Sequence, residues 1–165
     1  MARDDIVYLT VAQLAERIQR RELSPVELTD LYLERIERLN GQLAAYITVA
    51  AEQARAAARA AEEEVAQGQY RGPLHGVPVG VKDQFQTKGL RTTGGSRTLA
   101  EWVPDADATV VARVVEAGAV ILGKQNLTEF AMGGTVRFPY GTPRNPWNVE
   151  HTPGGSSAGS GAAVA

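Results

Sequence analysis

Residues 77–81 read Val-Pro-Val-Gly-Val and residues 119–122 read Ala-Val-Ile-Leu, two short apolar runs typical of buried strands. Between them lies a predicted helix with a stripe of valines, for which Asp105 or Asp107 is a candidate N-cap and which Gly118 ends. A strand, a helix and a second strand in this order favour a parallel pair of strands in an α/β fold. This stretch therefore decides the fold class, although Pro78 removes one hydrogen bond from its strand ladder.

The first 70 residues are predicted to be largely helical. Ser24 and Pro25 suit the N-cap and first position of a helix, and Asn40-Gly41 is expected to end it. Three further elements are expected: a helix after Thr10, a short strand at 46–49, and an Ala/Glu/Arg-rich helix over 50–67. Helices come first and the strand–helix–strand unit follows.

The composition excludes several classes of protein and of site. The 165 residues carry 17 Lys and Arg against 19 Asp and Glu, a net charge of −2 that gives no reason to expect nucleic acid or a membrane as partner. The absence of cysteine excludes a disulfide framework, a thiol nucleophile and a thiolate zinc site, and two histidines cannot form a three-His metal site. The charged N-terminus and the lack of about 18 consecutive apolar residues lead us to expect a cytoplasmic protein.

The length and the absence of repeats or linkers indicate one domain across residues 1–165. Its last residues, Ser160-Gly161-Ala162-Ala163-Val164-Ala165, look like the first turns of a small-residue helix, with no stop signal after them. We therefore expect the chain to be a partial domain, the N-terminal portion of a longer protein.

Lys82 is the first candidate functional residue. Only three of the 17 basic residues are lysine (Lys82, Lys88 and Lys124), and Lys82-Asp83 follows a predicted buried strand, at the end where α/β sheets build their sites. One interpretation is an ion pair with Asp83 at the rim. The other is a desolvated amine whose lowered pKa allows it to act as a general base.

The second candidate is the Gly/Ser-rich segment over residues 152–161, which runs into the C-terminal helix. Phosphate binding fits poorly, because no Gly-Lys-Ser/Thr follows and the dinucleotide spacing is missing. A flexible linker would not run directly into an apolar helix. The remaining interpretation is a rigid loop that holds a serine hydroxyl for proton transfer.

Together the two segments resemble the amidase signature family. Gly-Val-Pro-Val-Gly-Val-Lys-Asp over 76–83 is similar to that family's lysine motif, and Gly-Gly-Ser-Ser-Ala-Gly-Ser-Gly over 154–161 is similar to the start of its signature loop. Segments between them agree as well, among them Gly118–Lys124, Asn126–Phe130 and Arg144–Trp147. The resemblance covers roughly residues 10–165, essentially the whole chain.

The resemblance implies a Ser–cis-Ser–Lys triad on a mixed sheet covered by helices. Lys82 would be the base, and Ser156, preceded by a cis peptide, would pass the proton. Ser157 is a candidate supporting hydroxyl, and Phe130, Met132 and Gly133 stand where the family builds part of its acyl pocket. The nucleophilic serine would lie beyond residue 165, since Ser160 belongs to the helix start, so this chain alone is expected to be inactive.

Three functions stay open. The first is amide hydrolysis by the complete protein on a small-molecule amide, with no metal or organic cofactor and with a homodimer as one assembly that it could form. The second is that of the A subunit in a glutamyl-tRNA(Gln)/aspartyl-tRNA(Asn) amidotransferase, which would use the same triad to release ammonia from glutamine. We rank it second because residues 130–140 look more like stand-alone amidases. The third is a non-catalytic fragment or pseudo-enzyme.

Overall fold

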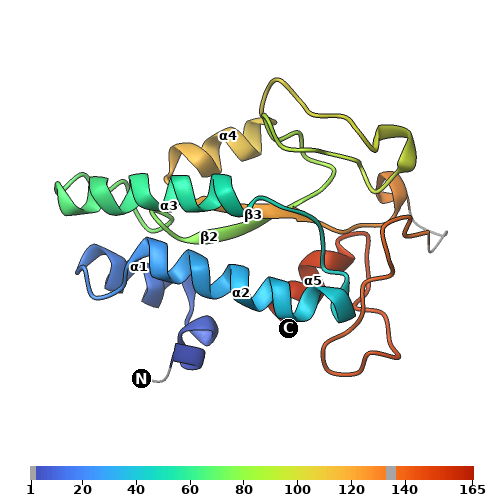
Figure 1. Cartoon of the computed structure of the whole chain (residues 1–165), viewed down its shortest axis with the longest axis horizontal. Coiled ribbons are helices and arrows are strands. Elements are labelled where there is room, and N and C mark those ends of the chain that lie inside the picture. The colour runs from blue at the N-terminus through green and yellow to red at the C-terminus, as the bar shows by residue number, and fades with distance from the viewer. Residues whose placement is uncertain (1–2, 133–136) are drawn as a thin grey trace.

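The structure is a computed structural model that describes residues 3–132 and 137–165. Its elements are, in chain order, η1 (Arg3–Tyr8), α1 (Val11–Gln19), α2 (Pro25–Leu43), β1 (Tyr46–Val49), α3 (Ala51–Ala66), β2 (Pro78–Lys82), η2 (Arg97–Leu99), α4 (Thr109–Glu116), β3 (Val120–Gln125), η3 (Glu129–Ala131) and α5 (Ala158–Val164). The predicted α/β class and the helical N-terminal region are confirmed (Figure 1).

The three strands form one mixed sheet in the order β1-β3-β2. β2 and β3 are parallel, as the strand–helix–strand pattern predicts, and β1 is antiparallel to β3. β2 is therefore an edge strand among the described residues. This explains why Val81 alone in it is buried, whereas the sequence suggested a fully buried strand.

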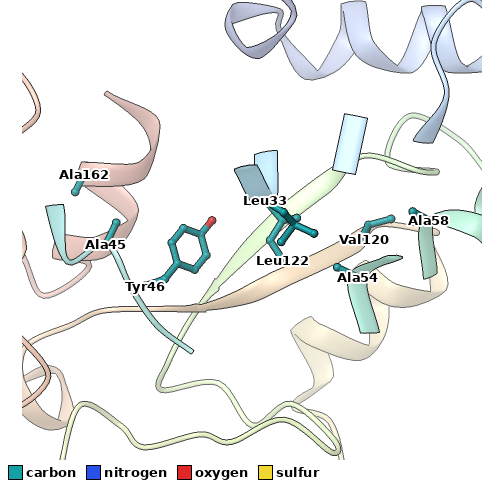
Figure 2. Packing of buried hydrophobic residues seen from close by; sticks show 8 residues of the cluster. All are labelled: Leu33, Ala45, Tyr46, Ala54, Ala58, Val120, Leu122 and Ala162. Atoms are coloured by element: carbon teal, nitrogen blue, oxygen red, sulfur yellow. The ribbon is translucent and has the colours of Figure 1, made fainter. Parts of the chain in front are cut away.

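Helices lie on both sides of this sheet, as Figure 1 shows. The main hydrophobic cluster joins α2, α3 and α5 to β3 through residues drawn in Figure 2: Leu33, Ala45, Tyr46, Ala54, Ala58, Val120, Leu122 and Ala162. A second cluster packs α1 and the start of α2 under the loop that leads into β2. No helix among the described residues is both long and apolar enough to cross a membrane.

Two predicted helix boundaries are wrong, for local reasons. α2 does not stop at Asn40-Gly41 but continues to Leu43, and Ala44 takes the left-handed conformation instead. The Asn40 side chain binds both the backbone N–H and the carbonyl of Tyr46, which ties the last helical turn to β1.

The second boundary is the start of α4, which begins at Thr109 without a side-chain cap. Asp107, one of the two candidate caps, instead accepts a hydrogen bond from the Lys88 backbone N–H at 2.6 Å. Its carboxylate therefore stabilises the loop before α4 and does not cap the helix.

Candidate active site

Lys82 and Ser156 meet at the carboxyl end of β2. Lys82 Nζ lies 2.6 Å from Ser156 Oγ, although the two residues are 74 positions apart in the chain. The Lys82 side chain is half-buried, and this desolvation lowers the pKa of its amine. An amine with a lowered pKa, in contact with a hydroxyl, can exchange a proton with it.

The loop that carries Ser156 is tied to the end of β3. The peptide bond between Gly155 and Ser156 is cis, the geometry that the family resemblance implies. The Ser156 carbonyl accepts a hydrogen bond from the Thr128 N–H at 3.2 Å, and Gly159 N–H donates to the Asn126 carbonyl at 2.8 Å. These contacts tie the backbone at Ser156 and at the start of α5 to the segment that follows β3.

Asp83 does not pair with Lys82, so the interpretation of a rim ion pair is wrong. Its carboxylate is fully buried and accepts hydrogen bonds from the backbone N–H and the hydroxyl of Thr93. Its other oxygen lies 3.4 Å from Nζ of Lys124, which is fully buried as well. Lys82 is thus left to face Ser156.

Lys124 is a buried cation whose position sequence reasoning did not assign. It donates to the Phe85 carbonyl at 2.7 Å and to Thr92 Oγ1 at 2.6 Å. Burial lowers the pKa of its amine, and Asp83 offsets part of this effect. The scarcity of lysine in this arginine-rich chain was the one signal that pointed to it.

Ser157, Phe130 and Met132 are the other predicted site residues that the structure describes. Ser157 is exposed and lines, with Lys82, a cavity of about 400 Å³ between β2, α4 and α5, but no hydrogen bond joins its hydroxyl to Lys82 in the described part of the chain. Phe130 and Met132 are exposed at 51% and 64%, on the segment that follows Thr128, and their place in an acyl pocket stays a prediction. Gly133 lies outside the described residues.

Two residues beside the site behave as structural groups. Glu129 accepts a hydrogen bond from the Ser96 hydroxyl at 2.7 Å. His75 is fully buried before β2, where Nδ1 accepts from the Arg71 N–H at 3.1 Å. Neither takes part in the Lys82–Ser156 contact.

Several curated proteins are similar in sequence to this chain. A 50% identical relative, the A subunit of the glutamyl-tRNA(Gln) amidotransferase from Moorella thermoacetica, aligns over 98% of this chain and 33% of its own length. The protein of the same name from Methylococcus capsulatus is 54% identical over 94% of this chain and 32% of its own length. The chain thus spans about a third of the length of these curated relatives.

Solved structures of known proteins are similar to this chain in fold and in sequence. The native peptide amidase from Stenotrophomonas maltophilia superposes with a TM-score of 0.86 at 38% identity, over 91% of this chain and 32% of that one. The A subunit of the glutamyl-tRNA(Gln) amidotransferase from Thermotoga maritima gives 0.74 at 38% identity, over 96% and 32%. The Amidase family model matches residues 27–165, and the chain therefore belongs to the amidase family.

Proposed function

We propose that this chain supplies the base and the proton-relaying serine of an amide-hydrolysing site. The observation that carries the proposal is the 2.6 Å contact between Lys82 Nζ and Ser156 Oγ, at the carboxyl end of a strand. Membership of the amidase family and the likeness to a peptide amidase support it.

The proposed reaction is acyl transfer followed by hydrolysis. Neutral Lys82 accepts a proton from Ser156, which in turn accepts the proton of a nucleophilic serine as that oxygen bonds to the amide carbonyl carbon. The C–N bond then breaks, the relay returns the proton to the leaving nitrogen, and ammonia or an amine departs. Water attacks the resulting ester and regenerates the serine. We assign the nucleophile to no residue of this chain, so the test uses the natural polypeptide that contains these residues, at its full length.

The test is ammonia release from simple primary amides by that polypeptide and by its Lys82→Ala and Ser156→Ala variants. Loss of either proton-transfer group should lower kcat by roughly a thousandfold or more, since the groups act as a unit. Lys88→Ala is the matched control, because Lys88 is exposed and makes no contact with Ser156. Variants that are folded and keep the parent's rate would refute the triad.

A second candidate is favoured by the names of the curated relatives. Both are A subunits of glutamyl-tRNA(Gln) amidotransferase, at identities higher than that of the peptide amidase. In this case the amide is glutamine, and hydrolysis should require partner subunits and charged tRNA. A polypeptide that hydrolyses varied amides by itself would exclude this role. A folded polypeptide without any amide hydrolysis, alone or with partners, would instead support a binding or assembly role.

A further inference from the structure

Gln125, the last residue of β3, links Lys82 to the helix that follows Ser156. It stands opposite Lys82 in the parallel register, and its carbonyl accepts a hydrogen bond from the Asp83 N–H at 2.9 Å. Its side-chain Oε1 accepts a hydrogen bond from the Ser160 hydroxyl at 2.7 Å. Ser160 lies four residues after Ser156, in the first turns of α5.

The amide nitrogen of Gln125 also has a hydrogen-bond partner. Nε2 donates to the hydroxyl of Tyr46, at 3.4 Å, on the strand β1 that flanks β3. Both Gln125 and Tyr46 are buried, with 5% and 9% of their surface exposed. A buried amide with a hydroxyl partner at each end is held between α5 and β1, because breaking either contact would leave buried polar groups unpaired.

Two glycines make room for this arrangement. A Cβ on Gly80 of β2 would lie 2.3 Å from Gln125 Nε2 and 2.7 Å from the Tyr46 hydroxyl, so a larger residue would displace the amide. A Cβ on Gly159 would lie 2.3 Å from the Ala45 carbonyl oxygen, so α5 could not approach the start of β1. The absence of a side chain at these two positions lets the amide and the helix pack closely.

A register shift decides which side chain reaches α5. Val79 pairs with Ile121 but Gly80 pairs with Gly123, so β3 has an extra residue at this point. Such a bulge reverses the alternation of side chains beyond it. Gln125 consequently faces the same side as Lys82 and α5, while Lys124 faces Asp83 on the opposite side.

We propose that Gln125 and Ser160 are positioning residues, which act through the α5 start to hold Ser156 against Lys82. This inference rests on the proposed function. Ser160 fixes the first turn of α5 to the end of β3, and the Ser156 loop precedes that turn directly. With this bond removed, only the backbone contacts of Ser156 and Gly159 hold the segment, so the start of α5 can shift and more water reaches the half-buried Lys82 amine.

The test compares Ser160→Ala, Ser160→Thr and Gln125→Leu with the unaltered natural polypeptide. We expect Ser160→Ala and Gln125→Leu to lower kcat roughly five- to tenfold, the cost of one hydrogen bond, with KM little changed. Ser160→Thr keeps the hydroxyl and should restore kcat. Gln53→Leu removes an exposed glutamine that binds the Gly89 carbonyl, away from the site, and is the matched control.

The pH profile separates positioning from a general loss of structure. Added water around Lys82 should move the acid limb of kcat/KM to higher pH in Ser160→Ala, because the amine then becomes neutral only at higher pH. The charged groups next to it in sequence and in the sheet, Asp83 and Lys124, pair with each other on the opposite face and are unchanged by the substitution. Unchanged kcat and an unchanged acid limb in both Ser160→Ala and Gln125→Leu would overturn the inference.

Failure of the proposed function gives a different result. If the unaltered polypeptide hydrolyses no amide, that function is wrong, but the pKa of Lys82 can still be followed by NMR of its ¹³C-labelled Cε. The signal is assigned by its loss in Lys82→Ala. A rise of this pKa in Ser160→Ala supports the positioning role, and an unchanged pKa contradicts it.

Discussion

Two lysines at the end of neighbouring strands have opposite surroundings. Lys82 faces a hydroxyl and lies where burial lowers the pKa of its amine. Lys124 is fully buried beside a carboxylate, with two further oxygen acceptors. A base must lose its proton to work, whereas a buried structural cation must keep both its proton and its partner. The Lys124–Asp83 pair therefore supports the fold, and Lys82, which has no ion pair in the part of the chain that the structure describes, can take the proposed role of base.

At this scale we predict that Lys124→Met destabilises the protein by about 3–5 kcal/mol, because it leaves the buried Asp83 carboxylate without its counter-charge. Urea unfolding measures the change. Lys88→Met, at an exposed lysine, should alter stability by less than about 0.5 kcal/mol. The double variant Lys124→Met/Asp83→Asn should recover much of the loss. If the losses of the two single variants simply add in the double variant, the pair is not coupled.

The site residues show how far sequence reasoning reaches. Lys82 and Ser156 were found because motifs carry them, and the structure brings them into contact. Gln125 and Lys124 were not assigned, because the bulge in β3 decides which face each one occupies. A strand that kept its alternation would have placed Lys124 on the side of α5. No local pattern in residues 119–125 reveals that shift.

At the scale of the element, two helix starts could be predicted from the sequence, whereas other boundaries could not. The expected helix start after Thr10, where the structure forms a capping box with Gln13, and the Ser24-Pro25 start are both confirmed, since each depends on hydrogen bonds within four residues. The end of α2 depends on the binding of Asn40 to Tyr46 and so on the place of β1. The start of α4 depends on a loop that binds Asp107. Tertiary contacts therefore decide where α2 ends and where α4 begins.

The N-cap of α2 provides a prediction at this scale. Ser24 Oγ accepts hydrogen bonds from the N–H groups of Val26 and Glu27, both at 3.1 Å. Ser24→Ala should therefore cost about 1 kcal/mol of stability, and Ser24→Gly noticeably less, because glycine suits the N-cap backbone. Urea midpoints of the two variants measure the difference. Equal midpoints for the parent and Ser24→Ala would show that the cap does not stabilise α2.

For the whole molecule, the buried His75 makes stability depend on pH. Burial lowers its pKa from the ordinary value of 6.5, although Glu64, 3.0 Å from Nε2, opposes the shift. Arg71 adds to the lowering. Below about pH 6.5 the unfolded chain takes up a proton that the folded chain does not, so the free energy of unfolding falls as the pH falls.

We predict a decline of the urea midpoint between about pH 7 and pH 5. His75→Gln should flatten this decline, whereas His151→Gln, at the exposed histidine, should keep it. Glu64, whose pKa is lowered mainly by its hydrogen bond to Arg71, contributes at more acidic pH, as its carboxylate is protonated in the unfolded chain first. A midpoint that stays constant across this range in the parent would contradict the role of His75.

The 74-residue separation between Lys82 and Ser156 also affects the order in which parts of the protein fold. Contacts within and between α1, α2 and α3 close short loops, so they can form early, whereas the entropy of closing a long loop delays distant pairs. During synthesis, the ribosome must release Ser156 and the first turns of α5 before the lysine meets its hydroxyl. We therefore expect the helical layer to be established first and the contact between Lys82 and Ser156 to form among the last steps. A nascent chain would carry a folded scaffold well before the proposed active site is assembled.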